Sequence, residues 1–288
     1  MTFNGQVVLN SLIAASFGNL MAMAVAPTYR LFRYFDLSLA GIALIAGYTT
    51  AVCVNTLGWP ATFSVLAAIT FTIIIHVGIK LVLPTLLQPK ANSSTLLLAS
   101  LGIYICIISM LSLAFGTELV APPSQQAGKI VQLVIGRGTH VQGISILFAI
   151  ILPVMYGMFL NQSRHGMAIR AASSSIELAE IAGIRMRLVS ILAVTVSAFF
   201  ASLAGALLAL DVGLRPTIGL QPILLGVVAV IIGVRGGLAG IGFAALSIAL
   251  LQNLIAANWG PHWQDAITFF ILLTYLLIQP KGVFCKSI

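Results

Sequence analysis

Charged residues are scarce in this chain. Asp, Glu, Lys and Arg make up 7% of the 288 residues, whereas hydrophobic residues make up 60% and the mean hydropathy is +1.10. A soluble domain carries about 25% charged residues. A very apolar soluble protein would still need helices that are polar on one side, and the apolar segments of this chain are not. The composition therefore predicts an α-helical membrane protein.

Residue patterns that carry catalysis or bind metals are also missing. The sequence has no Gly-x-x-x-x-Gly-Lys-Ser/Thr phosphate loop, and its four histidines and three cysteines show no metal-ligand or paired spacing. There is no Ser/His/Asp cluster with a plausible soluble scaffold. We therefore expect no enzyme activity, no metal and no cofactor in this chain. The net charge of +8 is spread over loops, so no nucleic-acid partner is expected either.

Seven long segments contain no Asp, Glu, Lys or Arg. They are Gln6–Tyr29, Leu37–Ile79, Ala91–Thr117, Val141–Ser163, Leu188–Leu210, Pro216–Val234 and Gly236–Gln264. A bilayer core needs about 20 apolar residues, and the turn residues at 55–60 divide the second segment into two helices. We predict an all-α, polytopic membrane protein with a single transmembrane domain over residues 1–288. Its helices are expected at about nine places, roughly 7–26, 36–54, 60–83, 95–116, 143–161, 188–210, 217–234, 237–257 and 263–279. A re-entrant segment at 217–234 fits as well.

Lys and Arg lie mainly on one side of these predicted helices. That side carries Arg30, Arg33, Lys80, Lys90, Arg164, Arg170, Arg185, Arg187, Arg235, Lys281 and Lys286, and the other side carries Lys129, Arg137 and Arg215. The richer side is normally cytoplasmic. This places the N-terminus outside, and the C-terminus and the insert 162–187 inside. The first span has no basic start and is followed by arginines, so we expect it to stay in the membrane rather than to be cleaved.

Acidic residues are rarer still, and none lies in the middle of a predicted span. The six are Asp36, Glu118, Glu177, Glu180, Asp211 and Asp265. A carrier driven by protons or sodium usually keeps ionisable groups near the bilayer midplane. The sequence therefore disfavours a secondary carrier and indicates that any energy for transport comes from another protein. Asp211 and Arg215 are interpreted as a solvated pair at the membrane interface, or as residues that guide an external partner.

The insert 162–187 is the one long charged segment between apolar spans. Ser174-Ser-Ile-Glu177 has the spacing of a capping box, and Gly183 is a typical residue just past a helix end. A short helix is therefore expected from Ser174 to Ala182. It would carry an apolar face beside two acidic residues that point elsewhere, namely Leu178, Ile181 and Ala182 with Glu177 and Glu180. Because two turns are unstable alone in water, this helix would fit a groove on another protein; a solvated loop lying on lipid headgroups is the alternative.

Small residues predict close helix contacts at two further places. Gly-x-x-x-Gly spacings occur at Gly233 to Gly237 and at Gly236 to Gly240, and Gly205 stands near other small residues, Ala201 and Ser202. Such residues let helix backbones approach in lipid, where apolar burial contributes little.

Six stretches together carry a family pattern. They are Arg164-His-Gly-Met-Ala-Ile-Arg-Ala-Ala172, Glu177–Ile184, Ala198–Leu208, Gly226–Gly237, and the C-terminal pair Trp263–Phe270 and Gln279–Phe284. The combination resembles the permease subunits of ATP-binding-cassette importers for branched-chain amino acids. Tyr29–Tyr48 corresponds more loosely, and Asp36-Leu-Ser within it is closer to the related ribose-type sugar permeases.

The resemblance implies a permease fold in which the insert 162–187 holds the helix that couples to a cytoplasmic ATPase. The residues expected to couple are Arg170, Ser174, Glu177, Leu178, Glu180, Ile181 and Gly183. Asp36, with Ser38 and Gly41, is expected to face the translocation pathway; the alternative for Asp36 is a carboxylate satisfied by the free N–H groups of a helix start.

The resemblance also implies the partners and the cargo. The partners are cytoplasmic ATPase subunits that bind ATP and magnesium, a second permease subunit (homologous or identical) and a periplasmic substrate-binding protein, all at a bacterial inner membrane. The cargo expected is a branched-chain or other neutral amino acid. Urea, short amides or a sugar remain open as cargo, and a passive channel for a small neutral solute remains open as a function.

Overall fold

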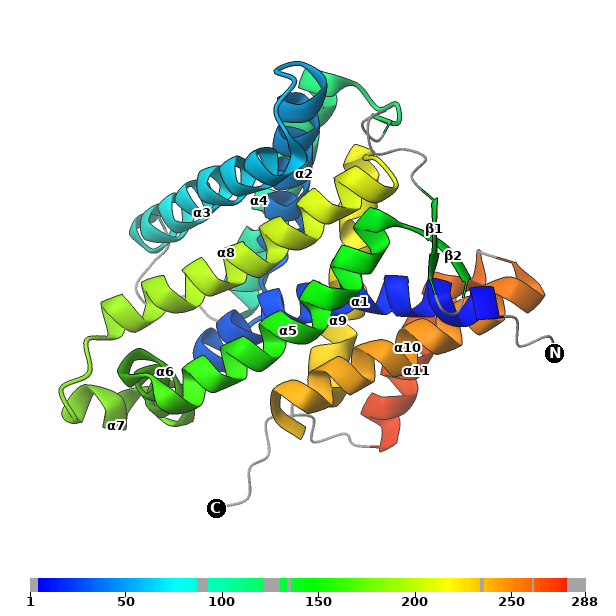
Figure 1. Cartoon of the computed structure of the whole chain (residues 1–288). Helices are drawn as coiled ribbons and strands as arrows, with labels where there is room; N and C mark the ends of the chain where they lie inside the picture. Colours follow the sequence, from blue (N-terminus) through cyan, green and yellow to red (C-terminus); the bar gives the residue numbers. More distant parts are fainter. Residues whose placement is uncertain are drawn as a thin grey trace.

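A computed structural model of the chain describes residues 5–86, 93–121, 130–133, 136–233, 236–260 and 262–278. Nearly all of them form helices (Figure 1). The helices are α1 (Gly5–Phe32), α2 (Ser38–Asn55), α3 (Ala61–Leu86), α4 (Ser93–Phe115), α5 (His140–Gln162), α6 (Arg164–Ser174), α7 (Ile176–Ile181), α8 (Met186–Asp211), the 3₁₀ turn η1 (Pro216–Gly219), α9 (Leu220–Gly233), α10 (Gly237–Trp259) and α11 (Trp263–Ile278).

Eight of the nine predicted spans are long and apolar enough to cross a membrane within the described residues. The seventh needs η1 and α9 together, because α9 alone has 14 residues. The helix at the ninth position, α11, has 16 residues. At 1.5 Å per residue α11 is about 24 Å long, which is shorter than a bilayer core of about 30 Å.

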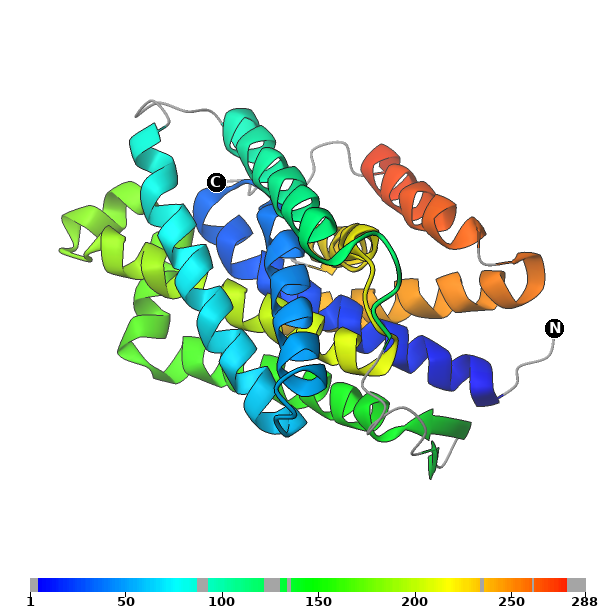
Figure 2. The ribbon, with the colours of Figure 1, turned by 90° about the horizontal axis from the view of Figure 1, so that it is seen from above.

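Three helices form the centre of the molecule. Most of the apolar length of α1, α2 and α8 is buried, whereas α3, α4 and α5 expose large apolar side chains along most of their length. Examples are Ile74 of α3, which is 71% exposed, and Leu113 of α4, which is 88% exposed. Seen from above, α10 and α11 lie on the opposite side of the molecule from α3 (Figure 2). Exposed apolar helix surfaces of this kind suit lipid or another membrane subunit.

Glycines allow close helix contacts at two places. A Cβ on Gly205 of α8 would overlap the backbone of Ala43 in α2, so the predicted close packing at Gly205 is present. The α9–α10 contact is made by Gly233 and Gly240, which are seven residues apart. Gly233 and Gly240 are the outer glycines of the two predicted spacings, whereas a Cβ on Gly236 or Gly237 would meet no atom within 4 Å, and Gly237 opens α10 with a φ of +70°.

A short antiparallel hairpin that the sequence did not predict precedes α5. Strand β1 (Ile130–Leu133) pairs with β2 (Gly136–Thr139), with Ile130 opposite Thr139. Thr139 then caps α5 through a capping box with Gln142. Both of these side chains donate hydrogen bonds to Asp211 at the end of α8, at 3.0 and 3.3 Å. Asp211 is therefore a bonded carboxylate that joins α5 to α8, and not merely a solvated one.

Candidate coupling surface and buried charge cluster

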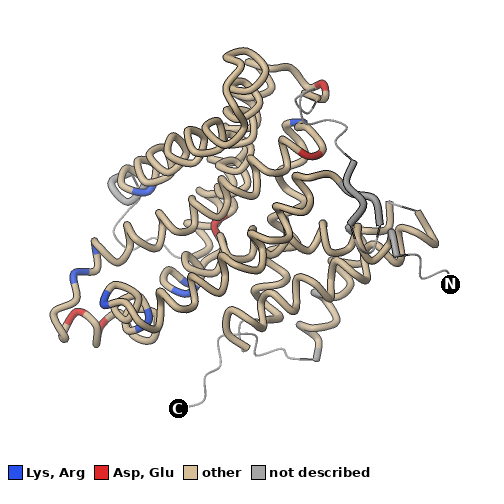
Figure 3. Tube along the Cα trace, viewed as in Figure 1, with Lys and Arg blue, Asp and Glu red and all other residues tan. Residues whose placement is uncertain are grey.

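The insert 162–187 lies at the end of the molecule where most Lys and Arg gather (Figure 3). It folds as two helices, α6 and α7, of which the sequence predicted only the second. Helix α6 begins because the Ser163 hydroxyl accepts a hydrogen bond from the amide of Gly166 at 2.8 Å. Gly166 must be a glycine, since a Cβ there would overlap the backbone of Phe159 and Leu160. The sharp turn from α5 into α6 thus depends on this Ser-x-x-Gly pattern.

Helix α7 begins one residue later than predicted. The N-cap is Ser175, whose hydroxyl accepts from the amide of Leu178 at 3.3 Å. The Ser174 hydroxyl donates to the carbonyl of Ala171 inside α6 instead, so the expected capping box between Ser174 and Glu177 is wrong. The predicted stop is confirmed, because Gly183 adopts a φ of +80° just beyond the helix.

The apolar face expected on α7 is uncovered in the chain. Leu178 is 68% exposed and Ile181 is 82% exposed, whereas Ala179 is 3% exposed and holds the helix to the body of the protein. Glu177 and Glu180 are also exposed. The surface formed by Leu178, Ile181 and these two glutamates is here called the coupling surface. A pair of apolar side chains held out beside acidic ones suits a partner groove rather than water.

Two arginines fix α6, which precedes the coupling surface, to the rest of the molecule. Arg170 donates to the side-chain oxygen of Asn161 in α5 at 2.7 Å. Arg33 follows α1 and donates to the carbonyl of Ser173 in α6 at 3.0 Å. Arg33 has a φ of +59°, which is uncommon for a residue with a side chain. The coupling role of Arg170 was expected from the sequence, whereas the contact of Arg33 was not.

Asp36 lies in a buried charge cluster between α1, α2 and α3. Its carboxylate is fully buried, and one oxygen lies 2.7 Å from the Lys80 ammonium of α3 and 3.7 Å from the His76 ring. The other oxygen accepts from the Ser38 hydroxyl at 2.5 Å. Lys80 also donates to the Tyr34 hydroxyl at 3.0 Å. The sequence allowed two interpretations of Asp36, a pathway residue and a carboxylate that caps a helix start. A cap at the start of α2 explains the hydrogen bond from Ser38, but it does not explain the ion pair with Lys80 of α3.

Electrostatics keep this carboxylate ionised. Burial alone raises the pKa of Asp36, but the ammonium of Lys80, the neighbouring His76 and the hydrogen bonds outweigh that effect, so the pKa lies below the ordinary value of 3.8. Desolvation and the Asp36 charge both raise the pKa of Tyr34. An ion pair that is neutral as a unit does not resemble the free carboxylate of a proton-driven carrier.

The three predicted pathway residues lie close together at the start of α2. Ser38 is buried against Asp36, and Gly41 meets Ile107 of α4, where a Cβ would come within 2.6 Å of the Ile107 Cδ1. Their role in translocation stays a prediction. Lys80 and His76 were not found from sequence, although a signal existed. Helices 36–54 and 60–83 form a hairpin, so the start of one and the end of the other meet at the same membrane face.

Polar groups that could hold a metal are absent from the described residues, where no three His, Cys, Asp or Glu side chains come together. A cavity of about 520 Å³ opens between α1, α5 and α10. Apart from Ser16 and Asn19 its lining is apolar or glycine. The amide nitrogen of Asn19 donates to the carbonyl of Ala149 at 2.8 Å, and its buried oxygen has no partner among the described residues. This cavity is suited to an apolar group.

Two permease proteins of known transport systems are similar to this chain in sequence. The high-affinity branched-chain amino acid transport system permease protein LivH of Escherichia coli K12 is 27% identical over 206 residues, which cover 68% of this chain and 66% of that protein, just under two thirds of its length. The corresponding permease protein BraD of Pseudomonas aeruginosa is 23% identical over an alignment that covers 96% of this chain and 94% of that protein.

A solved structure shares the fold. PsaBC from Streptococcus pneumoniae in complex with Fab aligns with a TM-score of 0.53 at 15% identity, covering 94% of this chain and 91% of that one. The model of the family described as branched-chain amino acid transport system / permease component matches residues 7–276. A match over this length identifies the chain as a multi-pass membrane protein of the branched-chain amino acid transport system permease family.

Proposed function

We propose that this chain is a non-catalytic permease subunit of an ATP-binding-cassette importer and forms part of the pathway for branched-chain amino acids. Its family and the names of its relatives support the class. The observation that carries the proposal is the coupling surface, where Leu178 and Ile181 stand uncovered at the basic end of the molecule. A passive channel has no need of such a surface.

The coupling surface is where a cytoplasmic ATPase would dock. That partner binds ATP and magnesium, and this chain binds neither. A movement of α7 would be transmitted to the start of α2 through hydrogen-bonded groups. The carbonyl of Ser173 in α6 accepts from Arg33, and Arg33 lies three residues before Asp36. The buried charge cluster would then move α2 and α3 together. Such coupling requires only that the permease has two conformations and that the ATPase stabilises one of them more than the other.

The remaining partners follow from the importer class. A second permease subunit, identical or homologous, would complete the pathway, and a periplasmic binding protein would deliver substrate at the opposite end. That end carries Glu118, Asp211 and Arg215, and a groove of about 660 Å³ lined by Leu119, Arg215 and Gln221 opens there.

The substrate assignment is supported by the cavity between α1, α5 and α10. Its apolar walls suit a branched aliphatic side chain. Urea or a sugar would place more polar atoms against the same apolar walls and leave them without partners. This favours neutral, aliphatic amino acids as cargo.

The location is proposed to be a bacterial inner membrane, with the coupling surface in the cytoplasm. Lys and Arg gather at the end that holds α6, α7 and the start of α8 (Figure 3), and the side richer in these residues is normally cytoplasmic. The N-terminus would then lie outside and the C-terminus inside.

A docking experiment tests the proposal. The double substitution Leu178→Asp and Ile181→Asp removes the exposed apolar pair without touching a buried side chain. We expect co-purification of the ATPase and leucine uptake to fall at least tenfold, while membrane insertion stays unchanged. The control is Leu57→Asp, because Leu57 is also exposed (57%) but lies between α2 and α3, away from α7. Normal uptake by the double variant would rule out the coupling role.

Energy dependence separates the rival functions. Uptake through an importer stops when ATP is depleted and continues when the ion gradient is collapsed. A secondary carrier gives the reverse result, and a passive channel for urea conducts in both conditions. Competition of labelled leucine by valine and isoleucine, but not by ribose or urea, would support the amino acid assignment.

A further inference from the structure

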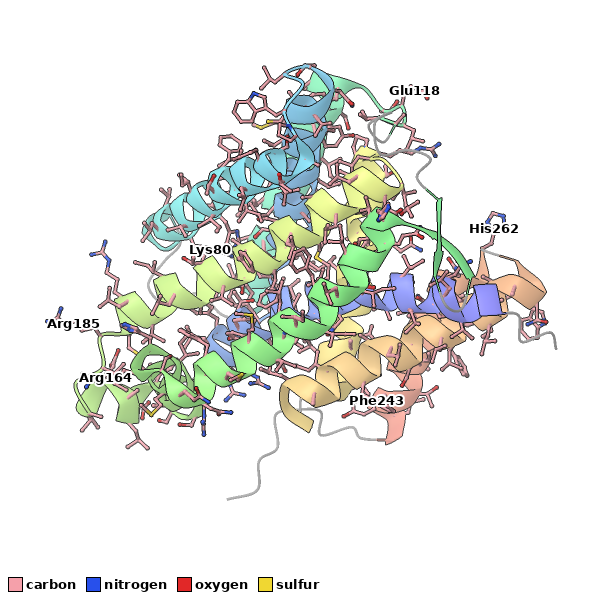
Figure 4. All side chains as sticks on the ribbon, viewed as in Figure 1. Lys80, Glu118, Arg164, Arg185, Phe243 and His262 are labelled. Atoms are coloured by element: carbon pink, nitrogen blue, oxygen red, sulfur yellow. The ribbon has the colours of Figure 1, made fainter. Side chains whose placement is uncertain are left out.

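A groove between α3 and α8 has a polar end and an apolar end. It has a volume of about 310 Å³ and is lined by Lys80 and Leu81 from α3 and by Arg187, Ser190, Ile191 and Val194 from α8. The four residues from α8 are spaced by three, one and three positions, so they form a single stripe along the helix. Arg185, only two residues before Arg187, does not line the groove. Figure 4 shows Lys80 beside α3 and Arg185 at the start of α8.

The polar end of the groove carries one uncompensated positive charge. Among the residues that line the groove, Lys80 is neutralised by Asp36, so the remaining charge is that of Arg187. Arg187 is exposed and has no hydrogen bond or ion pair with any described residue. The Lys80 ammonium has three N–H donors, of which two point to Asp36 and Tyr34. One donor of Lys80 and the guanidinium of Arg187 therefore remain for an anion.

The rest of the groove is apolar and follows both helices away from this charge. Leu81, Ile191 and Val194 provide its walls. Farther along, the hydroxyls of Thr72 and Ser202 lie 2.6 Å apart, so α3 and α8 are in direct contact there. The outer surface of α3 beyond the groove exposes Phe71 and Ile74, as a surface in contact with acyl chains does. A groove with a cationic end and apolar walls is complementary to a phospholipid, which has an anionic headgroup and apolar acyl chains.

We infer that this groove binds one anionic phospholipid, with its phosphate on Arg187, Lys80 and Ser190 and an acyl chain along Ile191 and Val194. The single negative charge of a phosphatidylglycerol headgroup matches the single free positive charge. The lipid would join α3 to the first turns of α8, directly after the coupling surface. The inference concerns the face of α3 and α8 and does not depend on which solute the permease carries.

Lipid binding to the full-length chain, in detergent and with its partner subunits if it purifies with them, tests the inference. Phosphatidylglycerol is titrated and its retention is counted by native mass spectrometry, with thermal unfolding as a second measurement. We expect Arg187→Gln to weaken retention about tenfold. Arg185→Gln is the matched control and should stay within about twofold of the wild type. Ile191 is partly exposed, so Ile191→Trp fills the apolar part and should also reduce retention while Arg187 is intact.

Three outcomes would overturn the inference. Equal losses in Arg187→Gln and Arg185→Gln would mean that general surface charge holds the lipid. Retention of phosphatidylcholine as strong as that of phosphatidylglycerol would mean that no anionic group is selected. Inorganic phosphate that raises the unfolding temperature as much as the lipid does would assign the site to a soluble anion.

Discussion

At the scale of single residues, the buried pair of Asp36 and Lys80 is the feature with the largest energetic consequence. Both charges have left water, so their attraction and the bonds from Ser38 and Tyr34 must offset a desolvation cost of several kcal/mol per ion. Such a pair contributes little net stability when complete. Removal of one partner leaves the other charge buried and uncompensated.

Lys80→Met is therefore expected to destabilise the protein by about 3–5 kcal/mol, because Asp36 loses its cation. Adding Asp36→Asn to Lys80→Met should recover much of that loss, since no buried charge remains. Thermal or denaturant unfolding in detergent measures both. A double variant no more stable than Lys80→Met would show that the pair does not act as a unit.

The pH dependence gives a second measurement on the same variants. In the wild type the pKa of Asp36 is lowered, so the stability it contributes is present above about pH 4 and is lost as the pH falls through the folded-state pKa, below 3.8. In Lys80→Met burial dominates and raises the pKa of Asp36. That variant should become more stable as the pH falls from 8 to 5, whereas the wild type gains nothing from this group over that range.

At the scale of elements, the sequence predicted the spans well and the connections less well. The uncharged runs predicted the positions of α1 to α5, α8 and α10, because a helix that crosses lipid must be long and apolar. The cap of α7 was misplaced by one residue, since Ser174 and Ser175 are both good caps and only the end of α6 decides between them. Lys80 and Arg33 were missed because their partners are distant in sequence, and partners of this kind depend on how the helices pack.

Gly205 provides a test of packing between elements. Gly205→Ala should destabilise the α2–α8 contact by about 1–3 kcal/mol or more, because the added methyl group meets the backbone of Ala43, which cannot move aside. The unfolding temperature and the yield of folded protein measure this.

Gly78→Ala is the matched control in another membrane helix, since nothing lies within 4 Å of its Cβ position. It should leave stability unchanged or raise it by up to about 1 kcal/mol. Equal effects of the two substitutions would mean that Gly205 matters for helix propensity and not for the contact.

At the scale of the whole molecule, charge and shape divide the protein into two ends. One end holds α6, α7 and most of the Lys and Arg, and the other holds Glu118, Asp211 and Arg215 (Figure 3). The sequence predicted this asymmetry from loop composition alone, because orientation in a membrane depends on which loops carry the cations.

Cysteine labelling tests the proposed orientation. In a background with the native cysteines replaced, Glu177→Cys should react with a membrane-impermeant maleimide only in inside-out vesicles. Glu118→Cys should react only in intact spheroplasts. Both side chains are exposed, so accessibility within the protein is matched. Labelling of Glu177→Cys from outside would reverse the orientation and remove the coupling surface from the cytoplasm.

Asp211 has a consequence for movement. Helices α5 and α8 are joined by the chain through α6 and α7 at one end, and by the Asp211 carboxylate to Thr139 and Gln142 at the other. These two connections restrain the relative movement of α5 and α8 at both ends. We therefore expect a displacement of α6 and α7 to be passed through both helices to the end of the molecule that holds Asp211.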